Sequence, residues 1–246
     1  IGEHCRILCK NKVIIDYMDV FLNHEKELPA KGIEVISQAD GVIFWSKTIM
    51  NIVTRKYRLR QFTYIPMGAD LSLLNFNKVV PRKFRHAYNL EKKFLVVYSG
   101  GIWMVKGREV QGILDLIKAY WLVARKVSNV FFIFDGFYPN EKVRRMVKDL
   151  NLGNHIQFLG PYRYNSEKHL GALAAADVLV LPATRYPPIY YAERMKIFDY
   201  MAAGKAIIAV RTPGVEGVLN EKACIYAELG DIESIADGMI EALGDK

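Results

Sequence analysis

The chain has 246 residues but only three cysteines, Cys5, Cys9 and Cys224, which cannot all pair with one another. With 51% hydrophobic residues it has enough apolar surface for a core without disulfide bonds, so we expect free thiols. It also lacks an apolar run near the ~20 residues that cross a bilayer, and its first segment, IGEHCRILCKNK, is charged where a signal peptide would be apolar. These absences indicate a cytoplasmic protein.

Other motifs are missing as well. His4, Cys5 and Cys9 lie close together, but no second cluster of cysteine and histidine completes a tetrahedral shell, so we expect no metal site. The segment SGGIWMVKG has neither the spacing of a dinucleotide fingerprint nor that of a P-loop. No nucleic-acid reader motif accompanies the positive charge, which argues against a nucleic-acid partner.

The formal net charge of +8 predicts attraction to an anionic partner. Positive charge is concentrated in residues 47–60, KTIMNIVTRKYRLR, which contain no acid. If this segment is a helix with Ile49, Ile52 and Val53 inward, its basic face is either solvated, which is the favoured interpretation, or in peripheral contact with a lipid surface.

Short runs rich in Val, Ile and Phe alternate with longer segments of helical periodicity, a pattern that predicts an α/β fold. Strict succession of strand and helix favours right-handed βαβ units in a doubly wound, Rossmann-like parallel sheet. The predicted strands are residues 12–16, 40–46, 62–66, 94–100, 129–135, 155–160, 177–182 and 205–210. The predicted helices lie near residues 106–127, 140–151, 166–175, 193–203 and 231–243.

Periodicity fades over residues 67–93, where polar, basic and turn-forming residues predominate. We interpret this segment as a connection between a partial N-terminal α/β domain, residues 1–70, and a C-terminal domain, residues 71–246. The upstream part contains only about three strands, too few for an independent parallel sheet. We therefore expect it to be incomplete or to depend on another chain.

Ligands of open α/β sheets collect at the carboxyl ends of the strands. Gly100 and Gly101 follow one strand, and Lys106 stands at the predicted start of the next helix, where a phosphate would fit. A plain turn with a solvated lysine is an equally good interpretation of that segment. Tyr162 follows another strand and offers an aromatic face to a planar base.

The stretch YYAERMKIFDYMAAG has the strongest pattern. Glu193, Lys196 and Asp199 recur every three residues, so a helix would place them near one face. A carboxylate there would accept hydrogen bonds from a sugar diol, and the lysine would neutralise a diphosphate. The alternative is a surface ion-pair ladder. The Ala-Ala-Gly exit at residues 202–204 favours a ligand site, because we expect it to pack the helix end tightly on the sheet.

Several segments, in this order, resemble the retaining GT-B glycosyltransferases of family 4, and the match covers nearly the whole chain. The similar segments are ADGVIFWS, YIPMGAD, VKGREVQGILDLIKAY, HIQFLGPY, AAADVLVLPA and DYMAAGKAIIAV. The resemblance implies a GT-B C-terminal domain and a hexosyltransferase that moves a sugar from a nucleotide diphosphate sugar to a glycan or lipid-linked acceptor. It implies no cofactor and no metal.

By position, the resemblance assigns Lys106 to the donor diphosphate, Lys196 as a second cation, Asp199 to the ribose and the Tyr162 loop to the base. Gly100 and Gly101 stand where the family has its diphosphate arginine. Tyr191 occupies the place of the family's first glutamate on the donor side.

The catalytic candidates are Glu193, which is displaced from the family position, and Asp19, an acceptor-side residue in the segment IIDYMD. Met18 stands where some members have a histidine. Because few residues precede the connection, we expect a fragment of a longer enzyme or a naturally reduced relative. Tyr191, Gly101 and Met18 differ from the residues that the family has at these positions. Two alternatives therefore stay open: a sugar-nucleotide-binding module that catalyses no reaction, and a GT-B type sugar-nucleotide epimerase.

Overall fold

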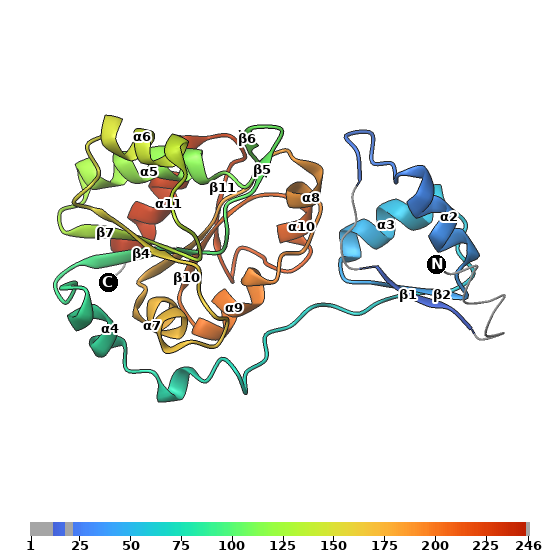
Figure 1. The fold of residues 1–246 in the computed structure, drawn as a ribbon, viewed down its shortest axis with the longest axis horizontal. Coiled ribbons are helices and arrows are strands. Elements are labelled where there is room, and N and C mark those ends of the chain that lie inside the picture. Colours follow the sequence, from blue (N-terminus) through green and yellow to red (C-terminus); the bar gives the residue numbers. More distant parts are fainter. Residues whose placement is uncertain (1–11, 18–21, 245–246) are drawn as a thin grey trace. The chain divides into compact units, whose positions relative to one another are not determined.

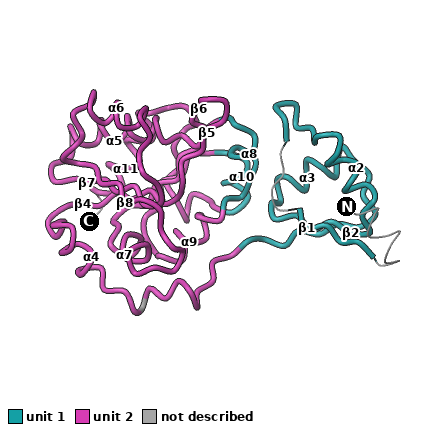
Figure 2. The backbone as a smooth tube through the Cα atoms, in the orientation of Figure 1, with its two compact units in different colours: residues 1–67, 185–194, 212–218 teal, residues 68–184, 195–211, 219–246 magenta. Residues whose placement is uncertain are grey.

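The structure is a computed structural model that describes residues 12–17 and 22–244. It contains two compact units, which Figure 2 shows in different colours. Unit 1 consists of Ile1–Met67, Arg185–Arg194 and Thr212–Val218, and unit 2 consists of Gly68–Thr184, Met195–Arg211 and Leu219–Lys246. Two short segments from the later part of the sequence therefore belong with the N-terminal residues.

Unit 1 is built on a three-stranded parallel sheet in the order β1-β2-β3. Its core is aliphatic and aromatic, with Ile36, Val42, Phe44, Ile49 and Val53 at most 2% exposed. The strands are β1 (Ile14–Tyr17), β2 (Gly41–Phe44) and β3 (Phe62–Tyr64), and the helices are α2 (Ala30–Gln38), α3 (Lys47–Lys56), α8 (Pro187–Tyr190) and α10 (Pro213–Glu216).

Helix α3 carries much of the basic segment that the sequence singles out. Its N-cap Ser46 accepts a hydrogen bond from the backbone N–H of Ile49, and its core-facing residues Ile49 and Val53 are buried. Arg55 and Lys56 stand in the last turn, where cations interact favourably with the helix dipole. The predicted inward face is therefore confirmed, although the helix ends at Lys56.

Unit 2 contains a six-stranded parallel sheet in the order β11-β10-β9-β4-β7-β8. The strands are β4 (Phe94–Ser99), β7 (Val130–Asp135), β8 (Ile156–Gly160), β9 (Val178–Leu181), β10 (Ala206–Val210) and β11 (Ile225–Ala227). Every residue of β9 is buried, as expected of a strand covered by helices on both faces. This sheet confirms the predicted doubly wound α/β fold.

The helices of unit 2 form two layers around this sheet. Figure 1 shows α5, α6 and α11 on one face, and α4 and α7 on the other. Helix α7 is buried from His169 to Ala175, because its small residues let it lie close to the strands. The bounds are α4 (Pro81–Ala87), α5 (Ile113–Lys126), α6 (Glu141–Asp149), α7 (Glu167–Ala175), α9 (Lys196–Ala203) and α11 (Ile232–Gly244), with a 3₁₀ turn, η1, at Phe76–Lys78.

All eight predicted strands are present, but the predicted helix 106–127 starts too early. Lys106 and Gly107 have positive φ angles of 47° and 75° and form the turn of a small hairpin, β5 (Met104–Val105) and β6 (Arg108–Glu109). Helix α5 begins only at Ile113, where the Glu109 carboxylate accepts the backbone N–H of Gly112 at 3.1 Å. Lys106 is therefore not at a helix N-terminus.

The sequence prediction also missed strand β11 and helices α2, α4, α8 and α10. Helix α4 has only seven residues and lies within the segment interpreted as a connection. It forms because Pro81 stands in its first turn and Phe84 is buried against α7, where a Cβ at Gly171 would lie 2.8 Å from the Phe84 ring. Tertiary packing therefore stabilises a helix with little periodicity.

The compact units divide the chain at Met67 and Gly68, close to the predicted domain boundary between residues 70 and 71. A single boundary does not anticipate the two later segments in unit 1. The assignment of acceptor and donor roles to the two parts stays a prediction.

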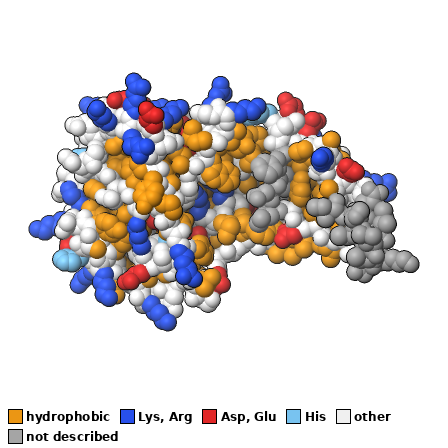
Figure 3. All heavy atoms as spheres, viewed as in Figure 1, with side chains coloured by type: hydrophobic (Ala, Val, Ile, Leu, Met, Phe, Trp, Pro, Cys, Tyr) orange, Lys and Arg blue, Asp and Glu red, His pale blue; other side chains and the backbone are white. Residues whose placement is uncertain are grey.

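On one face of unit 2 the basic side chains are dispersed (Figure 3). On the face shown in Figure 3, its Lys and Arg side chains are spread around the unit and do not merge into one continuous patch. Over residues 12–17 and 22–244, no helix is both long and apolar enough to cross a bilayer.

Candidate functional site

The backbone is crowded where β4, β7 and β8 end. Beyond the strands, the N–H of Gly100 donates to the carbonyl of Asp135 at 2.7 Å, and the N–H of Gly136 donates to the carbonyl of Gly160 at 3.1 Å. Gly136 has a φ of 124°, and a Cβ there would lie 2.6 Å from the carbonyl oxygen of Gly100. Only glycine fits this position, so the strand ends present bare backbone at the carboxyl edge of the sheet.

Helix α9 is fixed to this edge by Tyr200, whose side chain is fully buried. The backbone N–H of Ser99, the last residue of β4, donates to the Tyr200 hydroxyl at 2.8 Å. The interaction sets the position of the first turns of α9, which carry Lys196 and Asp199. Both residues therefore stand beside the strand ends.

Lys196 lies across Gly100. Its Nζ donates a hydrogen bond to the Tyr98 hydroxyl at 2.9 Å and lies 4.3 Å from the centroid of that ring. The φ of 137° at Gly100 favours glycine, and a Cβ there would collide with Nζ of Lys196 in this position. The same Tyr98 hydroxyl lies 2.9 Å from the carbonyl oxygen of Gly101. A cation is thus held directly over the bare backbone.

Asp199 is 8% exposed and accepts a hydrogen bond from the Tyr164 hydroxyl at 2.6 Å. Burial raises the pKa of the Asp199 carboxyl above its ordinary value, while the Tyr164 hydrogen bond and the nearby His169 and Lys196 oppose that shift. Because Tyr164 belongs to the loop after β8, this bond joins the loop to α9.

Tyr162 in the same loop packs against a buried acid–base pair. Its ring stacks on the His169 ring, with the centroids 3.8 Å apart and the planes at 7°. His169 Nδ1 lies 2.6 Å from Asp135 Oδ2. Sequence reasoning missed both Asp135 and His169; the only local signal was an aspartate at the end of a predicted strand, directly before a glycine.

The structure thus brings Gly100, Gly101, Lys196, Asp199 and Tyr162 to the carboxyl edge of the sheet in unit 2. The contacts described above do not include the other predicted residues. Lys106 is exposed in the β5–β6 turn, and Tyr191 is 9% exposed within the core cluster of unit 1. Asp19, like Met18 and the His4, Cys5 and Cys9 cluster, lies outside the described residues.

Glu193 belongs to unit 1 and does not share a helical face with Lys196 and Asp199, so that prediction is wrong. Helix α9 starts at Lys196, because the Glu193 side chain is held by tertiary contacts instead. Its Oε1 accepts the backbone N–H of Lys47 at 2.7 Å, and its Oε2 accepts the Tyr64 hydroxyl at 2.8 Å. Burial raises the pKa of the Glu193 carboxyl, and these two bonds oppose the shift.

The Ala-Ala-Gly exit of α9 also has a different basis from the predicted tight packing. Gly204 is exposed, and a Cβ there would meet no atom within 4 Å. Its φ of 62° is the left-handed conformation that ends helices, and its N–H donates to the carbonyl of Met201 at 3.1 Å. The glycine therefore serves to turn the backbone into β10.

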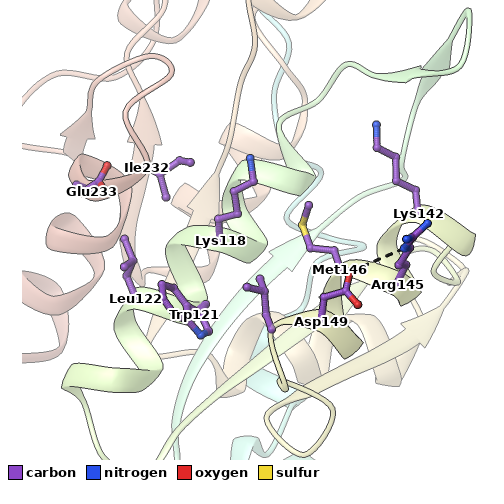
Figure 4. A pocket seen from close by; sticks show the side chains of 10 residues that line it. Lys118, Trp121, Leu122, Lys142, Arg145, Met146, Asp149, Ile232 and Glu233 are labelled. Carbon is purple, nitrogen blue, oxygen red and sulfur yellow. Dashed lines mark ion pairs between the residues drawn. The ribbon is translucent and has the colours of Figure 1, made fainter.

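A separate groove of about 520 Å³ lies between α5, α6 and α11 (Figure 4). Its floor is apolar, but its rim carries both signs of charge, and Arg145 forms an ion pair with Asp149 at 3.9 Å. The mixed rim selects neither an anion nor a cation. The lining residues are Lys118, Trp121, Leu122, Lys142, Arg145, Met146, Asp149, Leu150, Ile232 and Glu233.

The fold is that of GT-B glycosyltransferases. HepE from Anabaena, solved with UDP and glucose, matches 99% of this chain at a TM-score of 0.79 and 18% sequence identity. Sucrose-phosphate synthase from Thermosynechococcus elongatus matches 99% of the chain at 0.72 and 19% identity. WaaG, a glycosyltransferase involved in lipopolysaccharide biosynthesis, matches 98% of this chain at a TM-score of 0.69 and 13% sequence identity, and the match covers 71% of the WaaG chain. The chain spans 65% of the length of HepE and 61% of that of the synthase.

The family model for glycosyl transferases group 1 matches residues 93–245. The chain therefore belongs to the glycosyl transferases of group 1. A comparison with curated protein sequences found no significant match.

The two bonds of Glu193 predict its effect on stability. Glu193→Ala leaves the N–H of Lys47 and the hydroxyl of Tyr64 without their acceptor, and we expect it to lower the free energy of unfolding by about 2–3 kcal/mol. Glu193→Gln keeps an oxygen for Lys47 and a polar group for Tyr64, so we expect a loss of about 1 kcal/mol or less. Urea denaturation measures both, and equal losses would contradict this assignment.

The raised pKa of Asp199 predicts a pH dependence of stability. Above the ordinary value of 3.8, the folded protein holds a proton on Asp199 that the unfolded chain releases, so stability falls as pH rises through the raised pKa. Asp199→Asn removes this titration. We expect the stability of the wild type relative to the variant to decrease with rising pH in urea denaturation. An increase over the same range would mean that the pKa is lowered.

Proposed function

We propose that the chain is the donor-binding part of a glycosyltransferase that transfers a sugar from a nucleotide diphosphate sugar with retention of configuration. The observation that carries the proposal is the placement of Lys196 and Asp199 on one turn of α9, beside bare strand ends. This arrangement offers a cation and a carboxylate to opposite ends of one nucleotide. Membership of the family and the bound UDP of the HepE structure support it.

Lys196 is proposed to bind the diphosphate. Its ammonium group lies over Gly100, where no side chain separates a phosphate from the strand end. A fixed cation at this place would stabilise the negative charge that develops on the departing nucleoside diphosphate. Lys106, exposed in its hairpin turn, is proposed as a second cation for the same group, beside the backbone of Gly101. In this proposal the two lysines supply the charge, and no metal or cofactor is needed.

Asp199 is proposed to bind the ribose. An ionised carboxylate accepts hydrogen bonds from two neighbouring hydroxyls, which is the pattern that a ribose offers. The Tyr164 hydroxyl, 2.6 Å from Oδ1, fixes the orientation of the group. The ring of Tyr162 and the backbone of the same loop are proposed to hold the base, because a planar ring stacks well on an aromatic face.

The chemical step is the finer part of the proposal. Glu193 and Asp19 remain the proposed catalytic residues, with Tyr191 on the donor side, and a glycan or lipid-linked acceptor is proposed. Residues 47–60 supply the proposed peripheral contact with the cytoplasmic face of a membrane. The Glu193→Gln variant keeps partners for Lys47 and Tyr64, so it is the suitable variant for asking whether the acid takes part in turnover.

Nucleotide titration tests the donor site. We expect Lys196→Ala to raise the Kd for both UDP and pyrophosphate about tenfold, because it removes a charge-assisted contact worth about 1.5–3 kcal/mol. Asp199→Asn should raise the Kd for UDP by a similar factor and leave pyrophosphate unchanged. Isothermal titration calorimetry measures both, with the exposed Lys142→Ala as a matched control. Unchanged dissociation constants in both site variants would remove the assignment.

Retention is tested separately. With a sugar nucleotide and an acceptor, the longest natural form of the protein is expected to give a product with the anomeric configuration of the donor, as measured by NMR. An inverted product would overturn retention. Nucleotide binding without turnover in that form would favour the non-catalytic module, and an epimerised sugar nucleotide in the absence of acceptor would favour the epimerase.

A further inference from the structure

The pair Asp135–His169 is buried at the carboxyl edge of the sheet in unit 2. Asp135 ends β7 and is fully buried, and His169 in the first turn of α7 is 1% exposed. The backbone N–H of His169 also donates to the N-cap hydroxyl of Ser166 at 3.3 Å. Both the backbone and the ring of His169 are therefore held in place.

Burying this pair costs free energy of folding that packing of the core alone does not explain. His169 Nδ1 and Asp135 Oδ2 are 2.6 Å apart, but within the described part of the chain His169 Nε2 and Asp135 Oδ1 have no hydrogen-bond partner. Buried polar atoms without partners cost free energy, and apolar side chains of similar volume would fill the same space without that cost. The pair therefore calls for an explanation beyond packing.

The ring of Tyr162 supplies that explanation, because His169 forms the surface on which it rests. The two rings are nearly parallel, with centroids 3.8 Å apart. The Tyr162 hydroxyl lies 3.2 Å from Ser99 Oγ, and its ring edge would lie 2.9 Å from a Cβ at Gly136. Tyr162 is thus held at its face and its hydroxyl, and its edge lies beside the backbone of Gly136. A ring that is already fixed loses little conformational freedom when a base stacks on it.

We propose that His169 is a positioning residue for the nucleobase, acting through the ring of Tyr162, and that Asp135 sets the orientation of the His169 ring. This inference rests on the proposed function of the donor site. The loop after β8 then carries both nucleoside contacts, because Tyr164 in the same loop orients the Asp199 carboxylate. The affinity for the nucleoside depends on a residue that does not touch it.

Two substitutions of His169 separate the ring from the hydrogen bond. His169→Asn keeps a donor toward Asp135 but removes the ring, and we expect the Kd for UDP to rise about tenfold, since a stacked base is worth about 1–3 kcal/mol. The Kd for pyrophosphate should not change. His169→Phe keeps a flat ring beneath Tyr162 but leaves Asp135 without its histidine partner. We expect it to restore the Kd for UDP to within about threefold of the wild type and to lower Tm.

The exposed His155→Asn serves as a control that should change neither quantity. The proposal is overturned if His169→Asn leaves the Kd for UDP unchanged, if it weakens pyrophosphate equally, or if affinity simply follows Tm across the variants. Failure of the proposed function is recognised differently: the wild type would then bind neither UDP nor GDP. If UDP binds and Lys196→Ala weakens it while His169→Asn does not, the role of His169 alone is wrong.

Discussion

The close approach of backbone at the carboxyl edge of the sheet is the constraint on which the proposed site depends. Gly136 brings the end of β7 within contact of Gly100, and no Cβ fits between them. Because Gly100 also lacks a side chain, the ammonium group of Lys196 can lie across the end of β4. Tyr200 fixes α9 to the same strand. The position of the Lys196 charge is therefore determined by the packing of α9 as well as by the conformation of the lysine side chain.

Around this edge, the charged groups lie at the two ends of the proposed site. Lys196 interacts with Tyr98 at the end of β4, while Asp199 interacts with Tyr164 from the loop after β8. A nucleoside diphosphate would be complementary to this arrangement. Its diphosphate is an anion that pairs with the lysine, and its ribose hydroxyls can donate hydrogen bonds to the carboxylate. The loop after β8 joins the carboxylate to the aromatic face of Tyr162, on which the base is proposed to stack.

Sequence patterns predicted what depends on local periodicity and burial. The strands of unit 2 are apolar over most of their length, so their positions and the α/β fold followed from them. The β5–β6 hairpin was missed because Lys106 and Gly107 adopt left-handed conformations inside an otherwise helical pattern. The spacing of Glu193, Lys196 and Asp199 is helical, but contacts with Lys47 and Tyr64 hold Glu193 outside the helix. Asp135 and His169 are 34 residues apart in sequence, and no local pattern links them.

Glu193 and Asp199 have different hydrogen-bond partners, so the role of Glu193 in catalysis and the role of Asp199 in nucleotide binding are separate questions. Glu193 accepts hydrogen bonds with both oxygens inside unit 1, one of them from the first residue of α3, as befits a structural anion at a helix N-terminus. Asp199 has its hydroxyl partner inside unit 2. The contacts of Lys196, Asp199 and Tyr162 that build the proposed donor site lie within unit 2. The proposed contacts with the diphosphate, the ribose and the base by these three residues therefore do not depend on Glu193, whatever part Glu193 takes in the chemical step.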